Sequence, residues 1–437
     1  MKFLLHLHFY QPPRYNPFDG TYDVEESAYP FKNWNERIAA ECYELITPIL
    51  AYISSNWGPT LLEWMKREKK ALYRELVRVV RVSKCSICQP YYHIIMPLAD
   101  EFMQKINTIW GIRFFEKSFG YRPFGVWLPE CAVNVSTLRI LRRLGLRFTI
   151  LGEDQVRGAK GSGFYRVKGV DDFFVFLFDR EVSGVIAFGN DNFYKREFVK
   201  YIESNLIRKG IVFAATDGET FGHHKREGIA TLKKVLSSGF MGLSLNVAYK
   251  VLPVKGEVDI IDNTSWSCPH GLKRWHDDCG CSSGLHPGWN QKWRKPLREA
   301  MDWLRDVFYR FFFEFFRSIE VDPEELLSDY VYYMDLPSNV VTAWLEQKVG
   351  PSGILEKVKG YLECFRYVLA IYTSCGWFFD DVSGTESKII IRFSKKVVKN
   401  LEELTGYHIE EGFLNRLASS RSNILEIGSA REIYRKL

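Results

Sequence analysis

Residues 211–224 read IVFAATDGETFGHH, an apolar run of strand length that ends abruptly in polar residues. Four similar runs, rich in β-branched or aromatic residues, lie at Phe3–Phe9, Phe124–Leu128, Phe148–Leu151 and Phe173–Phe178. Segments with helical spacing, such as Phe198–Ile207, lie between them. Continuous apolar strands that alternate with amphipathic helices are typical of a parallel sheet with both faces covered. The first two thirds of the chain therefore predict an α/β fold, either a barrel or a doubly wound sheet.

The pattern changes to long helices after about residue 295, and Pro296 stands where a helix can begin. Apolar residues then advance by three or four positions, which predicts one buried helix face. This stripe consists of Leu297, Met301, Leu304, Phe308, Phe311 and Phe315. Further helices are expected at Pro323–Met334, Asn339–Val349 and Ile354–Ser374. We expect residues 1–295 to form a barrel, and residues 296–437 a helical bundle that packs on it and contributes to the cleft.

The composition is that of an ordinary globular protein with an excess of aromatic residues. Of 437 residues, 46% are hydrophobic, 26% charged and 15% aromatic, which excludes a disordered chain or a disulfide-rich miniprotein. The net charge of +6 is spread thinly, so we expect no nucleic acid partner. No stretch approaches the roughly 20 apolar residues that span a bilayer, and no signal-peptide cleavage site follows the N-terminus. We expect a cytoplasmic protein with no membrane partner.

Polar side chains cluster where predicted strands end. The first strand carries His6 and His8 and leads to Gln11, another ends at Glu130, and the strand quoted above ends at Asp217. In parallel α/β folds, active sites gather at the carboxyl ends of the strands. Two carboxylates delivered there suit acid/base chemistry. Asp217 precedes a glycine, however, and Asp-Gly also forms turns, so a turn-forming role stays open for it.

Four motifs in the first 225 residues combine histidines, aromatic residues and acids. They are HLHFYQPP (His6–Pro13), QPYYHIIMPL (Gln89–Leu98), GVWLPE (Gly125–Glu130) and TDGETFGHH (Thr216–His224). In order and spacing they resemble the signature regions of glycoside hydrolase family 57. A fifth signature of that family, a Trp followed by an acidic residue, resembles CGWFFDD with Trp377 and Asp380. Residues 263–304 also look like a little-characterised, cysteine-containing subgroup of this family.

The resemblance implies an incomplete (β/α)7 barrel followed by a C-terminal helical bundle. It also implies a retaining attack on an α-1,4-linked glucan or maltooligosaccharide without a cofactor, by an amylase or a 4-α-glucanotransferase. Glu130 would be the nucleophile and Asp217 the acid/base. Retention requires the two carboxyl groups to lie about 5 to 5.5 Å apart. Asp217 must also be protonated near neutrality, and a negative Glu130 with apolar neighbours such as Trp127 would raise its pKa.

Three histidines, His6, His8 and His93, match histidines that line the sugar site in that family. Neutral imidazoles can donate hydrogen bonds to sugar hydroxyls. One alternative is a zinc-dependent carbohydrate hydrolase or deacetylase, in which His6 and His8 bind the metal together with the last motif. Another is a glucan-binding protein without turnover. Because the Glu130 motif supplies a covalent nucleophile that a zinc hydrolase would not need, we expect no metal at this site.

Several tryptophans are expected around one substrate groove. Four of them, Trp266, Trp275, Trp289 and Trp293, lie in a polar loop region at residues 262–293. Apolar sugar faces pack on aromatic rings, so this loop predicts a platform or lid for sugar. The alternative is a compact loop that packs its own tryptophans beneath itself. The expected substrate-binding residues are His6, His8, Gln11, Trp34, His93, Trp127, His223, Trp266, Trp275, Trp377 and Asp380.

Nine cysteines are present, and an odd number precludes complete intramolecular pairing. Cys85 and Cys88 could form a structural zinc site with Cys268, Cys279 and Cys281 if the loops meet. The spacing of the last three is not that of a standard zinc finger. Disulfides or free thiols are therefore favoured over a metal, and disulfides are unusual in a cytoplasm.

Overall fold

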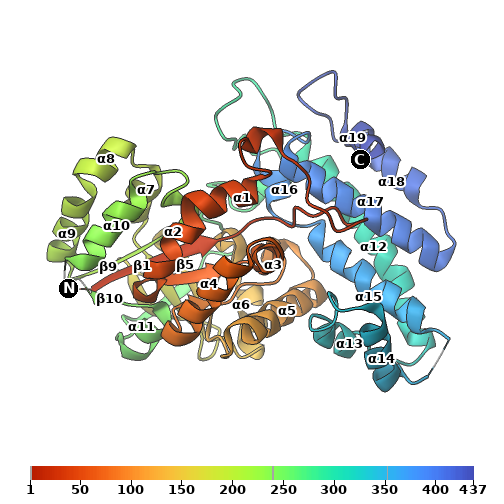
Figure 1. Cartoon of the computed structure of the whole chain (residues 1–437), viewed down its shortest axis with the longest axis horizontal. Coiled ribbons are helices and arrows are strands. Elements are labelled where there is room, and N and C mark those ends of the chain that lie inside the picture. Colours follow the sequence, from red (N-terminus) through yellow and green to blue (C-terminus); the bar gives the residue numbers. More distant parts are fainter. Residues whose placement is uncertain (1, 239–240, 352) are drawn as a thin grey trace. The chain divides into compact units, whose positions relative to one another are not determined.

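A computed structural model describes residues 2–238, 241–351 and 353–437, and its chain divides into two compact units. The first unit comprises Met1–Gln11, Tyr22–Tyr91 and Phe114–Trp266, and the second comprises Pro12–Thr21, Tyr92–Arg113 and Ser267–Leu437. The boundary after Trp266 differs from the expected one at residue 295. The reason is that the loop after Trp266 is bonded to the second unit, for example through Ser283, whose backbone N–H donates to Asp380 Oδ1 over 2.6 Å. Figure 1 shows the elements of both units.

A ring of parallel strands forms the centre of the first unit. In order around the ring the strands are β1 (Lys2–Phe9), β2 (Ser54–Trp57), β3 (Ser86–Ile87), β4 (Gly125–Val126), β5 (Phe148–Gly152), β8 (Phe174–Phe178) and β9 (Ile211–Asp217), which pairs with β1. All five residues of β8 and all but the first residue of β1 are buried. Burial on both faces explains why these strands have continuous apolar sequences.

The ring consists of two sheets that meet at two seams. Between β3 and β4, the Cys88 N–H donates to Gly125 O over 3.1 Å and the Trp127 N–H donates to Cys88 O over 2.8 Å. Between β8 and β9, the Asp179 N–H donates to Phe213 O over 2.8 Å. Each seam is an isolated contact and not a continuous ladder. The expected α/β fold with an incomplete seven-stranded barrel and a helical C-terminal part is confirmed.

Short strands extend the two sheets beyond the ring. The start of β1 also pairs in parallel with β10 (Met241–Gly242). On the other sheet, β8 pairs antiparallel with β7 (Gly163–Val167), which pairs in parallel with β11 (Glu257–Ile260). The last strand, β6 (Val156–Arg157), pairs antiparallel with β11.

Helices follow most strands of the ring. At the seam after β8, the Asp179 side chain accepts a hydrogen bond from the Val182 N–H over 3.0 Å and caps α7 (Arg180–Phe188). Both α7 and α9 (Phe198–Lys209) pack against β9 (Figure 1). The other helices up to residue 251 are α1 (Trp34–Ile38), α2 (Glu44–Ile46), α3 (Pro59–Glu68), α4 (Lys70–Ser83), α5 (Glu101–Phe119), α6 (Val135–Arg143), α8 (Asp191–Arg196), α10 (Gly228–Ser237) and α11 (Leu245–Val251).

The second unit is predominantly helical. Its helices are α12 (Arg294–Ser318), α13 (Pro323–Tyr330), α14 (Ser338–Val349), α15 (Leu355–Ala370), α16 (Cys375–Phe378), α17 (Thr385–Thr405), α18 (Glu410–Leu417) and α19 (Ala430–Lys436), with part of α5. Asp322 caps α13, where Pro323 occupies the first position that needs no N–H donor. None of the helices described is long and apolar enough to cross a membrane.

The buried stripe of α12 differs from the predicted one at its C-terminal end. Leu297, Met301, Leu304 and Phe308 are buried as expected, but the stripe continues through Phe312 and Phe316. The predicted Phe311 and Phe315 are only half-buried. The run FFFEFF offers an aromatic residue on either side of the stripe, so helical spacing alone could not decide between them.

Candidate active site

Strand register brings the polar residues of three neighbouring strands together. In β1, His8 pairs with Asp217 of β9 on one side and with Asn56 of β2 on the other. Residues in register on neighbouring parallel strands project to the same face, and side chains two residues apart share that face. His6, His8, Asn56 and Asp217 therefore lie on one face at the carboxyl ends of their strands.

The two histidines of β1 are held as neutral rings. His6 Nδ1 lies 3.1 Å from Ser54 Oγ, and His6 Nε2 lies 2.9 Å from Asn56 Oδ1. His8 Nδ1 contacts the same amide at 3.0 Å, and Asn56 Nδ2 also donates to Gln89 Oε1 over 2.6 Å. Burial lowers the pKa of both histidines to about 3, against the opposing effect of the Asn56 hydrogen bond. Both rings are therefore uncharged at neutral pH.

Two tryptophans support these histidines. Trp127, which directly follows β4, stacks on His8 with ring centroids 4.7 Å apart and on His6 at 5.2 Å. Trp266 meets Trp127 edge-on at 4.9 Å and donates its Nε1–H to Glu130 Oε2 over 3.1 Å. Trp127 is fully buried, so in this structure it orients the histidines, whereas Trp266 is partly exposed.

Glu130 lies in an unusual backbone turn after β4. Its φ of 58° and that of Cys131, 49°, both fall in the left-handed region, which costs about 1 to 2 kcal/mol for each residue with a Cβ. The Trp266 N–H donates to Glu130 O over 3.0 Å, and Gln155 Nε2 donates to Cys131 O over 2.8 Å. Strain that the surrounding structure holds in this way is characteristic of functional sites. Here it presents the half-buried Glu130 carboxylate to the indole of Trp266.

Asp217, the last residue of β9, is exposed on one side and closely surrounded by protein elsewhere. Loss of hydration is the largest cause that raises its pKa well above the usual range, followed by the charge of Glu219 and then that of Glu130. Water that reaches only part of the carboxyl group reduces this effect without reversing its direction. These causes act in the direction that favours the protonated form of Asp217.

Glu219 supplies part of that electrostatic field. Its side chain is buried, and burial raises its pKa to about 7 against hydrogen bonds that stabilise the charged form. Tyr43 Oη donates to Glu219 Oε1 over 2.6 Å, and Gln11 also hydrogen-bonds to this carboxylate. The expected substrate-binding residue Gln11 thus contacts Glu219 and Tyr43 in this structure.

A model described as glycosyl hydrolase family 57 matches residues 16–243, which carry both carboxyl groups. The chain belongs to glycosyl hydrolase family 57. A second model, described as a domain of unknown function (DUF3536), matches residues 289–437. No curated protein matches the sequence.

Solved structures of family 57 proteins share the fold at low sequence identity. An exo-type maltose-forming amylase from Pyrococcus sp. ST04 aligns with a TM-score of 0.73 and 17% identity over 95% of this chain and 82% of its own. A branching enzyme from Thermococcus kodakaraensis aligns with a TM-score of 0.61 and 16% identity over 95% and 94% of the two chains. A 4-α-glucanotransferase from Thermococcus litoralis gives 0.57 and 15% over 93% and 58%. These likenesses support the fold assigned above.

His223 was also expected to bind sugar. It belongs to a polar cluster with Glu41 and Trp34 in the first unit. His223 Nδ1 lies 2.5 Å from Glu41 Oε2, and its ring meets Trp34 edge-on at 6.0 Å. Arg37 lies over the Trp34 ring at 5.0 Å and pairs with Glu41. This cluster is partly exposed on the first unit, and Trp34 and His223 stay predicted substrate contacts.

Four expected substrate-binding residues lie in the second unit, and all four are buried. Trp275 and Trp377 have 0% exposure, so neither ring presents a free face in this structure, and their stacking on sugar stays a prediction. Asp380 accepts hydrogen bonds from Ser283 and contacts His286 Nδ1 at 3.1 Å. His93, whose Nδ1 lies 2.7 Å from Ser374 Oγ, is 2% exposed.

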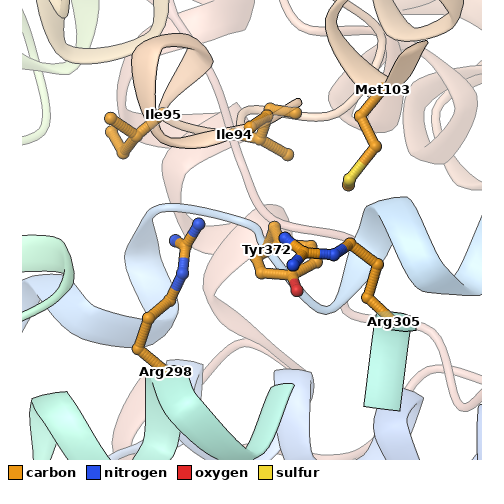
Figure 2. A pocket seen from close by; sticks show the side chains of 7 residues that line it. Ile94, Ile95, Met103, Arg298, Arg305 and Tyr372 are labelled. Carbon is orange, nitrogen blue, oxygen red and sulfur yellow. The ribbon is translucent and has the colours of Figure 1, made fainter. Parts of the chain in front are cut away.

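A narrow pocket of the second unit can be set aside as a sugar site. Figure 2 shows Arg298, Arg305 and Tyr372 facing Ile94, Ile95 and Met103 across it. The Arg298 guanidinium lies 4.6 Å from the centre of the Tyr372 ring, and Tyr372 Oη donates to Asp302 Oδ1 over 2.8 Å. The empty space totals only about 190 Å³ and has no room for a water molecule. These residues form a packed structural cluster.

Sequence reasoning missed the residues that hold the site in place. Asn56 and Tyr43 were not singled out, although they contact the two histidines and Glu219. Asn56 lies in the polar stretch SSNW, which carries no apolar strand signal. Tyr43 lies 176 residues from Glu219 in sequence, so only the folded chain reveals their hydrogen bond.

Proposed function

We propose that the chain is a retaining enzyme of α-1,4-linked glucans, with Glu130 as the nucleophile and Asp217 as the acid/base. The observation that carries this proposal is the contrast between the two carboxyl groups. Burial and two neighbouring negative charges raise the pKa of Asp217, whereas the Trp266 indole donates a hydrogen bond to Glu130. A protonated acid beside a hydrogen-bonded carboxylate is the pair that retaining hydrolysis requires.

In the first step, Asp217 donates its proton to the glycosidic oxygen while Glu130 Oε attacks the anomeric carbon. The bond from that carbon to the leaving oxygen breaks, and a covalent glycosyl ester forms on Glu130. Loss of the Asp217 proton leaves a carboxylate. In the second step, this carboxylate takes a proton from water or from a sugar hydroxyl, whose oxygen then displaces Glu130.

The neutral histidines suit the binding of sugar hydroxyls. An uncharged imidazole such as that of His8 can donate or accept a hydrogen bond as positive charge develops on the sugar ring, whereas both nitrogens of His6 already contact Ser54 and Asn56. Trp127 fixes the planes of both rings by stacking. The resemblance to family 57 implies a maltooligosaccharide substrate, and the uncharged histidines with the stacked Trp127 also favour an uncharged substrate.

Product analysis on maltoheptaose tests the proposal and separates its two versions. Products that are only shorter indicate hydrolysis, whereas longer products indicate transfer to a sugar acceptor. Glu130→Gln and Asp217→Asn should each lower turnover by at least about 10²-fold, since each removes a group that acts in the transition state. Asp171→Asn is the matched control, because the Asp171 side chain is exposed and its backbone carbonyl makes the only hydrogen bond described for it. Unchanged turnover in Glu130→Gln or Asp217→Asn would overturn the assignment.

Nothing in the arrangement of His6 and His8 favours the zinc-dependent alternative. Their described nitrogen contacts are to Ser54 and Asn56. Within the described residues, the group of possible metal ligands that does come together lies elsewhere, in the second unit. The glucan-binding alternative would be favoured by oligosaccharide binding without any product after long incubation.

A further inference from the structure

Three cysteines and one histidine of the loop after Trp266 meet in the second unit. Cys268 Sγ lies 4.0 Å from Cys279 Sγ and 3.8 Å from Cys281 Sγ, and Cys281 Sγ lies 3.4 Å from His270 Nδ1. The four potential ligand atoms all lie within 4.8 Å of one another. We propose that Cys268, His270, Cys279 and Cys281 form a structural Zn²⁺ site.

The distances match the edges of a zinc tetrahedron. With Zn–S bonds of about 2.3 Å and Zn–N bonds of about 2.0 to 2.1 Å, tetrahedral angles place two sulfurs about 3.8 Å apart and a sulfur and a nitrogen about 3.6 Å apart. Two Sγ–Sγ separations and one Sγ–Nδ1 separation, three of the six edges, lie within about 0.2 Å of these values, and the other three are at most 4.8 Å. Three thiolates and one imidazole form a common donor set of closed, structural zinc sites.

A buried cation beside the cluster provides a second, independent observation. Arg294 has 0% exposure, and its Nη1 donates to Cys279 Sγ over 3.6 Å while Nη2 donates to Cys281 O over 2.9 Å. Its other hydrogen-bond partners are the carbonyls of Phe378 and Phe379, and no carboxylate within the described residues pairs with it. A buried, unpaired charge is costly.

Zinc binding resolves this imbalance of charge. Three thiolates and one Zn²⁺ carry a net charge of −1, which the Arg294 guanidinium balances. The three thiol protons leave as the metal binds, and no oxidant or reductant is needed. Hydrogen bonds from Arg294 to a ligand sulfur and to a ligand backbone are the kind of outer contacts that orient metal ligands.

The location explains what the metal does for the fold. Between Ser267 and Arg294 the chain has a single short helical turn, Lys273–Trp275, and most residues from 282 to 290 are exposed. A loop of this length without regular structure is uncommon unless something fixes it. The metal closes the loop at its base, and Ser283 and His286 then fasten its outer part to Asp380.

This site differs from the cysteine group considered from the sequence. Cys85 and Cys88 lie buried in the first unit, and Cys88 Sγ donates to Gly125 O. His270, two residues after Cys268, takes the fourth position instead. The proposed ligand pattern is Cys-x-His followed by Cys-x-Cys, whereas the sequence alone favoured free thiols or disulfides.

Metal analysis of the purified full-length chain tests the site without any activity assay. The wild-type protein should contain about one equivalent of zinc, and Cys281→Ser and His270→Ala should each lower this content more than about tenfold. Cys375→Ser and His408→Ala lie outside the cluster and should keep it. Replacement of zinc by Co²⁺ should give the thiolate charge-transfer absorption and the d–d bands of a tetrahedral site.

Several outcomes would overturn the proposal, even if some variants fail to fold. A zinc content below about a tenth of an equivalent in wild-type protein, after growth with added zinc, would overturn the proposal. Iron in place of zinc would overturn it as well. If metal-free protein has two fewer titratable thiols than expected, and a reductant restores both, the cysteines form a disulfide instead. As a further check, removal of zinc should loosen the loop and speed cleavage by trypsin after Lys273 and Lys292, whose side chains are exposed, and added zinc should slow it again. Cleavage that is the same with and without zinc would contradict the structural role.

Discussion

Replacing Gly218 with alanine tests whether close packing fixes the segment that carries Asp217 and Glu219. An ideal Cβ at Gly218 would lie 2.0 Å from Phe9 Cε1 and 2.4 Å from Phe9 Cδ1 and Cζ. Carbon atoms normally approach to about 3.5 Å, so the ring or the backbone must move by more than about 1 Å. Phe9 cannot retreat easily, because it is fully buried and stacks on Trp57 with centroids 3.9 Å apart.

The expected cost of Gly218→Ala is about 1 to 3 kcal/mol of folding free energy, as for other overpacked cores. Thermal unfolding should show a loss of about 2 to 4 °C for each kcal/mol. Because a displacement of about 1 Å at a catalytic group can cost about 10²-fold in rate, turnover of maltoheptaose should fall more than stability alone explains. Circular dichroism melts and initial rates well below the melting temperature separate the two effects.

Gly184→Ala is the matched control for this experiment. Gly184 lies inside α7, and an ideal Cβ there meets no atom within 4 Å. Alanine in a helix interior is roughly 0.5 to 1 kcal/mol more favourable than glycine, so this variant should be slightly more stable and fully active. A Gly218→Ala protein with wild-type melting temperature and wild-type rate would refute the idea that Phe9 holds the acid/base segment in place.

Three further predictions concern single side chains. Glu219→Gln removes a negative charge that raises the pKa of Asp217. The alkaline limb of the pH profile of kcat/KM reports loss of the proton from the proposed acid, so this limb should move to lower pH. A limb that does not move would contradict the coupling of the two carboxyl groups. Trp266→Phe keeps a ring but loses the donor to Glu130, and kcat should fall about tenfold or more with little change in melting temperature; an unchanged kcat would show that this donor plays no part. Burial alone would raise the pKa of Asp381, but hydrogen bonds from residues 383, 422 and 423 lower it. The ionised Asp381 therefore contributes its full stabilisation of the fold at pH values above its unfolded-state pKa, and this stabilisation is lost as the pH falls. Asp381→Asn should therefore destabilise the protein in urea at pH 7 by about 1 to 3 kcal/mol, with a smaller difference in acid; equal differences at both pH values would contradict this account.

The sequence allowed the long strands and the short β4 (Gly125–Val126) to be predicted, but not β2 and β3. β1, β5, β8 and β9 are apolar runs that end within two residues of their expected bounds. The strand β2 has the sequence SSNW, and β3 has two residues. Such segments become strands through backbone pairing with neighbours, and a single sequence carries little trace of that pairing.

The candidate site was only partly predictable for a similar reason. His8 and Asp217 lie at the carboxyl ends of β1 and β9, and Glu130 follows β4, so topology alone predicts that they lie at the same end of the strands. Their supports, by contrast, depend on which distant side chains the register brings into contact. For Trp275 the composition of the loop left open whether the ring faces a sugar or packs beneath the loop, and the structure shows the ring fully buried. Composition cannot decide which way an indole faces.

The two seams of the ring separate the sheet that carries Asp217 from the sheet that Glu130 follows. Asp217 belongs to the sheet of β1, β2, β3 and β9, while Glu130 follows β4 of the other sheet. Each seam consists of one or two backbone hydrogen bonds. The proposed nucleophile and the proposed acid/base therefore lie on different sheets, which only these few backbone hydrogen bonds join at the seams. We therefore expect substitutions at Cys88 or Asp179, which lie at these seams, to alter the spacing of the two carboxyl groups, although neither residue takes part in the proposed chemistry.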